Sequence, residues 1–362
     1  FEMKIQIEQK DLANLVSKVG RAAATSNTIP VLQGMYLKAA NGKLTAQATD
    51  LEIGVKLDAS EVQVHEEGEV LVHSRNFEVF VKNLPSEVIT LVTSDNKLQV
   101  KYGRSQAQLN LMTDAEYPNL PVCEEEILTI KGNALRKALI KVLPAVAKTH
   151  FRQVFTGVLI DIQKDKTVFV GSDTHRLNVC EVAAQGISQK IIVPAKTLDE
   201  VLRLVDDEET VVILTNGNNL LFKAGNIEIT SRIIDGAYPD YRQVIPTTFV
   251  SELNVKTTVL KQSLQRLLTL PKTGAIHTTK ISLSETAELS TISDEGEIKE
   301  VLDEIKKTGD DLVISFNSNY LMDAVKLMPE ETKISFSGQV SPALIKGEDG
   351  FLSVLVPLRD KN

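Results

Sequence analysis

The chain has 362 residues, of which 43% are hydrophobic and 24% charged, a composition typical of soluble globular proteins. No apolar run approaches the roughly 20 residues that a membrane-spanning helix needs, no signal peptide opens the chain, and two cysteines are too few for a disulfide framework. We therefore expect a cytoplasmic protein of two or three domains, with its natural start at Met3 and with Phe1 and Glu2 as added residues. Taken alone, the net charge of −8 argues against a nucleic-acid partner.

A strand followed by an amphipathic helix opens the chain and then recurs twice. After a short strand that contains Ile5, apolar residues fall at helical spacing from Leu12 to Val19. Leu128 and Leu253 hold the place of Ile5 in two later copies, 123 and then a further 125 positions along the chain. The apolar positions of the strand and the helix keep these two offsets. A constant spacing of this kind predicts an internal repeat of about 120 residues.

Three other features keep the same period. A Ser/Thr–Asp pair follows a β-rich stretch in each copy, and a second strand leads into a second amphipathic helix each time. DAEYPNL at 114–120 matches DGAYPDY at 235–241, with an offset of 121. A common register across four segments indicates three tandem domains, because chance would not repeat it. The aspartates are Asp50, Asp173 and Asp294, the second helices are led by Phe77, Leu198 and Leu321, and the expected domains span 3–123, 124–248 and 249–362.

Each copy combines two short amphipathic helices with many short strands and polar turns. This pattern predicts an α+β fold in which the two helices pack on antiparallel sheets. The third expected helix contains Pro144, which kinks or ends a helix, so Lys148 joins that helix only if it continues past the proline. The expected helices span 9–22, 74–85, 132–148, 194–205, 257–272 and 318–328.

Basic residues are concentrated on these helices. Together the six ranges carry a charge of +10, which leaves −18 on the rest of the chain. Lysine and arginine lie opposite or beside the apolar stripe in the first helix of each copy. A single helix of this kind would be an ordinary solvated face, but three equivalent ones in an acidic protein favour contact with the phosphates of a polyanion, without sequence readout. The candidates are Lys10, Lys18, Arg21, Arg136, Lys137, Lys141, Lys148, Lys261 and Arg266.

Support for catalysis is slight. None of the five histidines is spaced to bind a metal with another, and no phosphate-binding or dinucleotide-binding glycine motif occurs, so we expect no metal and no cofactor. GSDTHRL at 171–177 contains Ser172 and His175, which leaves a hydrolase as one alternative. Asp173 belongs to the repeated Ser/Thr–Asp feature and is expected to hold a turn. Cys180 is expected to be a buried structural thiol.

Three segments of the second and third repeats combine apolar side chains, prolines and arginines. They are THRL at 174–177, YPDYRQVIP at 238–246 and SVLVPLRD at 353–360. A concave apolar patch rimmed by arginine suits a short peptide with hydrophobic anchors and a carboxylate. Two or three buried anchors at about 1.5–3 kcal/mol each, less the cost of ordering, give an affinity on the order of micromolar. We therefore expect a site for peptide partners that exchange.

The three repeats, SDTHRL, DGAYPDYRQVIP and the C-terminal VLVPLR together resemble the bacterial DNA polymerase III beta subunits, the family of sliding clamps. The resemblance covers the chain from Met3 onward. It implies a head-to-tail homodimeric ring around double-stranded DNA, with helices lining the hole, in the cytoplasm at the nucleoid. It also implies a processivity factor without a catalytic site, which tethers the polymerase III alpha subunit, the clamp loader, other DNA polymerases and repair proteins through short linear motifs. A peptide-binding adaptor that does not encircle DNA is the other alternative.

The resemblance assigns residues to three surfaces. Arg75 and Lys196 would approach DNA beside the basic residues named above. The family's motif usually has glycine where Thr174 stands, so a bulkier pocket wall is expected here. The dimer edges would hold Ala107 and Leu109 on one side and Thr269 and Leu270 on the other. The partner pocket, between the second and third domains, would use Arg152, Phe155, Ser172, Thr174, His175, Arg176, Leu177, Pro239, Val244, Asn317, Tyr320, Val340, Pro342, Val354, Val356, Pro357, Leu358 and Arg359.

Overall fold

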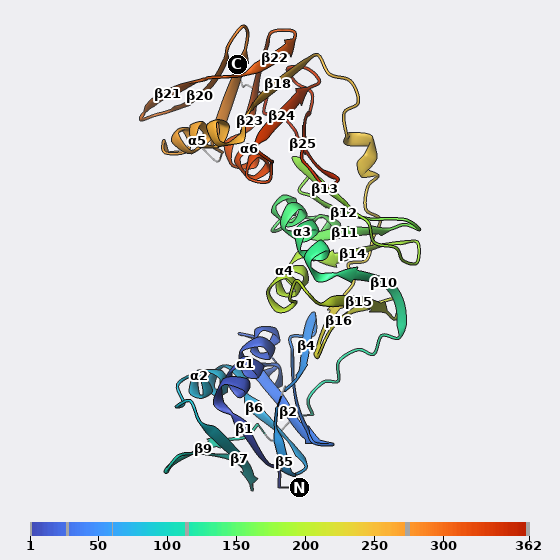
Figure 1. Cartoon of the computed structure of the whole chain (residues 1–362), viewed down its shortest axis with the longest axis vertical. Helices are drawn as coiled ribbons and strands as arrows, with labels where there is room; N and C mark the ends of the chain where they lie inside the picture. The colour runs from blue at the N-terminus through green and yellow to red at the C-terminus, as the bar shows by residue number, and fades with distance from the viewer. Residues whose placement is uncertain (1, 27–28, 60, 113–115, 272–275, 360–362) are drawn as a thin grey trace. The chain divides into compact units, whose positions relative to one another are not determined.

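The computed structural model describes residues 2–26, 29–59, 61–112, 116–271 and 276–359. Its element order repeats three times, each time as antiparallel strands interrupted by two short helices (Figure 1). Each helix begins within one residue of its predicted start, directly after a strand. The helices are α1 (Gln9–Val19), α2 (Ser74–Lys82), α3 (Gly132–Val142), α4 (Ala195–Leu204), α5 (Thr257–Leu267) and α6 (Ser318–Val325).

The helices end earlier than predicted. The third ends at Val142 and continues only as a 3-10 turn over Leu143–Ala145. Pro144 has no N–H to donate to a further α-helical hydrogen bond, and its ring clashes with the carbonyl group of the residue four positions earlier. Lys148 therefore lies beyond the helix, so the condition for its place on the basic helical face is not met.

The chain divides into two compact units, each with two antiparallel sheets. The first unit comprises 1–133 and 196–233, and the second comprises 134–195 and 234–362. In the first unit the five-stranded sheet has the order β5 (Gln63–Glu66), β1 (Lys4–Glu8), β7 (Val88–Ser94), β8 (Lys97–Tyr102) and β9 (Ser105–Asn110). The eight-stranded sheet has the order β10 (Glu125–Lys131), β15 (Thr210–Thr215), β16 (Asn219–Ala224), β17 (Ile227–Arg232), β4 (Ile53–Asp58), β3 (Lys43–Thr49), β2 (Gly34–Ala40) and β6 (Gly68–His73).

The second unit is built in the same way. Its nine-stranded sheet has the order β14 (Gln189–Pro194), β11 (Gly157–Ile162), β12 (Thr167–Ser172), β13 (Arg176–Val182), β26 (Phe351–Leu355), β25 (Ala343–Lys346), β24 (Glu331–Phe336), β18 (Ser251–Lys256) and β22 (Lys306–Gly309). Its four-stranded sheet has the order β21 (Gly296–Leu302), β20 (Ala287–Ser293), β19 (Thr278–Leu283) and β23 (Leu312–Asn317).

The largest sheet of each unit joins two successive repeats. In the first unit β4 of the first repeat pairs with β17, the last strand of the second repeat. In the second unit β13 of the second repeat pairs with β26, the last strand of the third. The two joints use equivalent strands, so the repeat extends from the single domain to the way in which domains connect.

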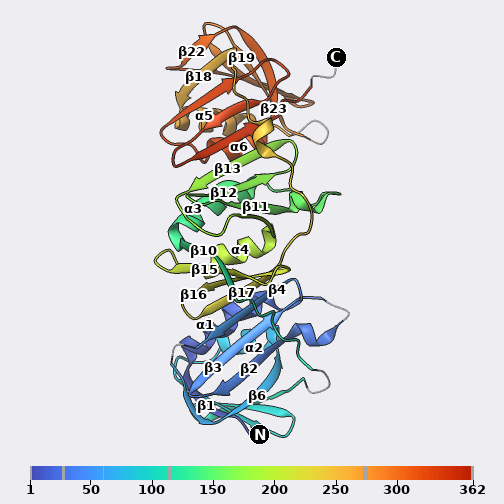
Figure 2. The same ribbon diagram turned by 90° about the vertical axis from the view of Figure 1, so that its right-hand side faces the viewer.

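The apolar stripe predicted for the first helix forms the core beneath that helix. Its members, from Leu12 to Val19, are at most 1% exposed, and each buried leucine contributes about 1.5–3 kcal/mol to folding. Helix α1 packs on β3 and β4 and against α2, and Figure 2 shows β2 and β3 of this sheet from another side. The α+β prediction is confirmed, with helices on antiparallel sheets.

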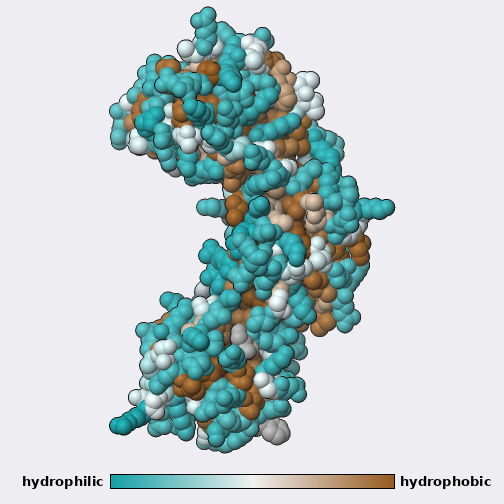
Figure 3. All heavy atoms as spheres, viewed as in Figure 1, coloured by the Kyte–Doolittle hydropathy of each residue, from teal (hydrophilic) through white to brown (hydrophobic). Residues whose placement is uncertain are grey.

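The face of the molecule seen in Figure 3 is mostly hydrophilic, with apolar residues gathered in patches. No helix in the described part of the chain is both long enough and apolar enough to span a membrane.

Candidate functional site

The GSDTHRL segment forms a tight turn between β12 and β13. The Asp173 carboxylate accepts hydrogen bonds from the N–H groups of His175 and Arg176, both at 3.0 Å. The Ser172 hydroxyl donates to the carbonyl oxygen of Arg176 at 2.8 Å and accepts from the N–H of Thr174 at 3.1 Å. Both side chains hold the backbone of the turn, as predicted for Asp173.

The same five-residue turn occurs at three places. In the first repeat the Thr49 hydroxyl donates to the carbonyl oxygen of Ile53 at 2.8 Å, and Asp50 accepts two backbone hydrogen bonds. Asn216 takes the aspartate's place in the third example. The predicted match at Asp294 does not adopt this turn, because Ser293 pairs directly with Gly296 in a shorter hairpin. The turns span Thr49–Ile53, Ser172–Arg176 and Thr215–Asn219.

A cavity of about 260 Å³ lies beside the turn at 172–176, within the second unit. Its wall comes from the turn and β13, from the 238–244 segment, and from the end of β26. The lining residues are Phe155, Ser172, Thr174, Arg176, Leu177, Tyr238, Pro239, Asp240, Tyr241, Val244, Pro342, Val354 and Val356.

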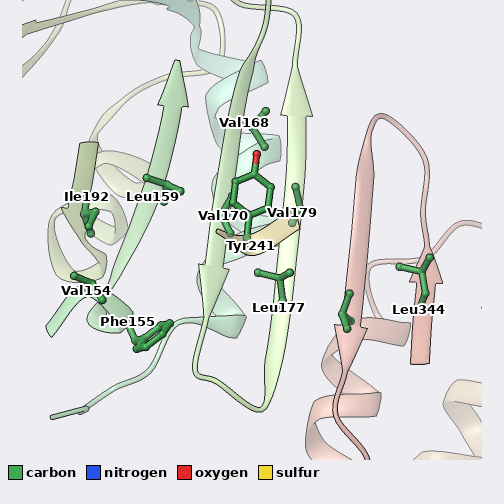
Figure 4. Packing of buried hydrophobic residues seen from close by; sticks show 11 residues of the cluster. Val154, Phe155, Leu159, Val168, Val170, Leu177, Val179, Ile192, Tyr241 and Leu344 are labelled. Atoms are coloured by element: carbon green, nitrogen blue, oxygen red, sulfur yellow. The ribbon is translucent and has the colours of Figure 1, made fainter. Parts of the chain in front are cut away.

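An apolar cluster forms the floor of this cavity. Leu177 and Val354 are buried opposite each other on the paired strands β13 and β26. Tyr241 lies over β12 and β13 beside Val170 and Val179, and Phe155 reaches the same region from the 3-10 turn before β11 (Figure 4). The floor is therefore set by backbone pairing and close packing, which keeps its shape fixed.

Arg176 is held in place on the cavity wall by three partners. Its guanidinium pairs with Asp173 at 3.0 Å and with Asp323 of α6 at 2.8 Å. The ring of Tyr320 lies 4.0 Å from the guanidinium carbon, in a cation–π contact. With 12% of its side chain exposed, Arg176 is a rigid part of the wall.

A buried carboxylate fixes the 238–244 segment to β11. Asp161 is 5% exposed, and it accepts a hydrogen bond from Arg242 at 3.0 Å and one from the Tyr241 hydroxyl at 3.3 Å. These partners offset the cost of removing the carboxylate from water. Burial, which outweighs the effect of Arg242, raises the pKa of Tyr241 to about 12, so its hydroxyl is neutral and able to donate.

The Tyr238 hydroxyl differs in its hydrogen bonding from Tyr117, its counterpart in the first repeat. Tyr117 accepts from the Thr49 N–H at 2.9 Å and donates to the Gly34 carbonyl oxygen at 3.4 Å. The buried Tyr238 hydroxyl has no hydrogen-bond partner among the described residues. Burial, together with the nearby Asp173 carboxylate, raises the pKa of Tyr238. Tyr238 thus lines the cavity while its neutral hydroxyl is buried without a partner among the described residues.

The predicted pocket residues fall into two groups. Ten line the cavity, and the other eight border it or lie further along the same segments. Arg152 stacks on Phe155, Tyr320 stacks on Arg176, and the His175 carbonyl oxygen accepts a hydrogen bond from Val356. The eight that do not line it are Arg152, His175, Asn317, Tyr320, Val340, Pro357, Leu358 and Arg359.

Sequence reasoning missed three lining residues, Tyr238, Asp240 and Tyr241. All three lie in YPDYRQVIP, the segment at 238–246 that was predicted to contribute to the site, but the residues assigned individually within it were only Pro239 and Val244. The signal that could have found them is the difference between the copies. The first copy ends in Leu120 and the second in Tyr241.

The equivalent place in the first unit is filled. Gly54 and Thr230 pair there as Leu177 and Val354 do at the cavity. A Cβ added to Gly54 would lie 2.4 Å from the Leu120 side chain and 2.5 Å from the Thr230 hydroxyl. Leu120 therefore packs directly against Gly54, whereas Leu177 lines the cavity in the second unit.

The predicted DNA-facing residues differ in whether their side chains already form contacts within the chain. Arg21 pairs with Glu200, Lys196 with Asp50 and Arg266 with Glu300, and Lys141 lies 5.5 Å from the ring centre of Phe351. Arg136 lies on α3. Within the described ranges the remaining six form no ion pair with a carboxylate, and they are Lys10, Lys18, Arg75, Lys137, Lys148 and Lys261.

The predicted dimer residues lie at or near open sheet edges. Ala107 and Leu109 are on β9, the edge strand of the five-stranded sheet. Thr269 and Leu270 follow the end of α5, which packs on β21. Strand β21 is itself an edge strand of the four-stranded sheet, and sequence reasoning missed it.

These features define an α+β protein of three linked repeats with a preformed apolar pocket. Family models for the DNA polymerase III beta subunit match most of the chain: the N-terminal domain at 3–121, the central domain at 129–240 and the C-terminal domain at 242–359. The chain belongs to the DNA polymerase III beta subunit family, the beta sliding clamps.

Individual relatives agree over their full lengths. The beta sliding clamp of Staphylococcus aureus is 28% identical over 374 aligned residues, which cover 99% of each chain. The crystal structure of the sliding clamp from Bacillus subtilis superposes with a TM-score of 0.94 at 27% identity and covers 100% of both chains. A sliding clamp from Pseudomonas aeruginosa bound to griselimycin gives 0.93 at 25% identity, covering 99% of this chain and 100% of that one.

Proposed function

We propose that two copies of the chain close head to tail into a ring around double-stranded DNA and tether DNA polymerase III and other replication and repair proteins to it. The three clamp domains would span 3–123, 124–248 and 249–362. The chain contributes no catalytic step of its own, and its Ser172 hydroxyl is already engaged in a turn. It works in the cytoplasm, where the DNA and these partners are.

The pattern of strand pairing at the joints between repeats carries this proposal. The last strand of the second repeat pairs with β4, and the last strand of the third pairs with β13. Two strands that are equivalent to these joint strands take no part in either joint. They are β9, which is the last strand of the first repeat, and β21, which is the third repeat's counterpart of β4 and β13. Both are edge strands. Pairing of β9 in one copy with β21 in another would continue the same joint between chains and remove two open edges.

The basic helices supply the contact with DNA. The exposed lysines and arginines listed above can meet phosphates of any sequence. Weak contacts suffice, because a closed ring is retained on DNA by topology and not by affinity. Such a clamp can slide while it holds its partners.

The cavity beside Arg176 supplies the contact with partner proteins. Its apolar floor and arginine wall suit a short linear motif with hydrophobic side chains and a carboxylate. The wall is already ordered, so little entropy is lost on binding there.

The test is retention on circular DNA. The protein is loaded onto a nicked circle by a clamp loader with ATP, and the bound fraction is separated from free protein by gel filtration at moderate salt. We expect the protein to be retained on the circle and to be released once the circle is linearised by a single cut. We expect no retention when ATP is omitted.

Equal retention on circles and on linear DNA, or none on either, would contradict encirclement. Binding of partner peptides by a protein that sediments only as a monomer at micromolar concentration would favour the non-encircling adaptor instead.

A further inference from the structure

The third residue of the five-residue turn takes a left-handed backbone conformation at all three places. The φ angles are 76° at Leu51, 74° at Thr174 and 90° at Gly217. Glycine adopts this region without steric cost, whereas a β-branched residue is a true outlier there. The turn accepts glycine, so its hydrogen bonds do not require a side chain at this position.

Thr174 is the example that lines the cavity. It lines the cavity together with Tyr238, Pro239, Asp240, Tyr241 and Val244 of the 238–244 segment. The neighbouring wall is stiff, because Arg176 is held by two carboxylates and a tyrosine ring, and Pro239 and Pro342 have fixed backbone angles. A ligand therefore meets the full width of the threonine and cannot readily displace the wall around it.

We propose that Thr174 is a specificity-determining residue that narrows the pocket, so that it favours partner motifs with a slender aliphatic anchor over motifs with an aromatic ring at that anchor. This inference rests on the proposed binding of linear motifs in the cavity. A leucine or methionine side chain can adjust its rotamers to a narrow space, whereas an aromatic ring is rigid and wide. The strained backbone at Thr174 persists although glycine occupies the equivalent place at Gly217.

The test compares two short peptides that differ only in one anchor, leucine or phenylalanine, by fluorescence anisotropy with the full-length protein. Wild type should bind the leucine peptide more tightly. Thr174→Gly should lower the preference for leucine over phenylalanine by about tenfold, as expected when the room for a large side chain in an apolar pocket changes. Thr174→Val keeps the width and removes the hydroxyl, so its preference should stay within about twofold of wild type.

Leu51→Gly is the matched control. It makes the same change at the same position of the equivalent turn, outside the cavity, and should leave the preference unchanged. An unchanged preference in Thr174→Gly with both peptides still bound would overturn the role of Thr174 alone. An equal shift in Leu51→Gly would do the same. Failure of wild type to bind either peptide would overturn both this inference and the proposed pocket.

Discussion

The single carboxylate of Asp50 both accepts the backbone hydrogen bonds of a turn and forms an ion pair with a lysine. It accepts hydrogen bonds from the N–H groups of Glu52 and Ile53 at 3.0 and 2.9 Å, and it pairs with Lys196. Burial alone would raise the pKa of Asp50, but these hydrogen bonds and the ammonium group together lower it. The folded state therefore favours the ionised form.

This shift predicts a pH-dependent contribution to stability. A carboxyl group with a lowered folded pKa stabilises the fold above its unfolded pKa of about 3.9, and the contribution is lost as pH falls through the folded pKa. Asp50→Asn should keep the turn, since Asn216 accepts the same two backbone hydrogen bonds. It should lose the Lys196 pair, at a cost of about 1 kcal/mol at pH 7.

Thermal unfolding of wild type and Asp50→Asn checks this from neutral pH downward. The gap between their midpoints should narrow below pH of about 4. A gap that stays constant across this range would show that the charge of Asp50 does not stabilise the fold.

The joint between β4 and β17 depends on the absence of a side chain at Gly54. The Cβ of alanine would lie 2.4 Å from Leu120 and 2.5 Å from the Thr230 hydroxyl. We expect Gly54→Ala to lower the free energy of unfolding by about 1–3 kcal/mol through overpacking. Because one obstacle is the end of a leucine side chain, adding Leu120→Ala should recover part of the loss.

Gly171 provides the contrast. A Cβ there would lie 2.3 Å from the carbonyl oxygen of Val142, a backbone atom that no truncation removes. Gly171→Ala should therefore stay destabilised when the nearby Val146 is shortened. Chemical denaturation of the single and double variants measures these couplings, and purely additive effects at Gly54 and Leu120 would contradict the account.

Helix starts and the turn at Asp173 could be predicted from the sequence because their determinants are local, whereas the turn expected at Asp294 is a shorter hairpin. The apolar period gave each helix start, and Pro144 marked the place where α3 ends. The pairing of β4 with β17 could not be predicted, since partners far apart in the chain meet only after folding. The edge strand β21 was missed because GEIKEVL is mostly polar and does not resemble a buried strand.

The candidate site was predicted in part for the same reason. The Ser172–Arg176 turn and the C-terminal segment combined apolar residues with arginine, and the family resemblance added individual pocket residues such as Phe155. Tyr238 and Tyr241 lay in the predicted segment 238–246, but the sequence did not show which of its side chains would line the cavity. Only the three-dimensional comparison with Gly54 and Leu120 shows why one joint is open and the other filled.

At the scale of the whole molecule, the two joints within the chain also fix the register of the proposed joint between chains. Val55 lies opposite Ile229, and Asn178 lies opposite Ser353. By repeat equivalence, Ile298 on β21, which pairs with Thr291 as Val55 pairs with Ala48, should lie opposite Ala107 on β9 of the partner copy. Directly opposed residues have Cβ atoms about 4.5–5.5 Å apart, close enough for a disulfide after a small adjustment. Diagonal neighbours lie too far apart to form one.

Disulfide cross-linking of cysteine variants tests ring closure through this pairing most directly. The double variant Ala107→Cys with Ile298→Cys is oxidised and compared with Ala107→Cys with Glu300→Cys, which is on the same face but out of register by two residues, and with each single variant. We predict a covalent dimer from the in-register pair alone, since the native cysteines are buried. No covalent dimer from that pair, or an equal yield from the shifted pair, would contradict a ring closed by β9 and β21.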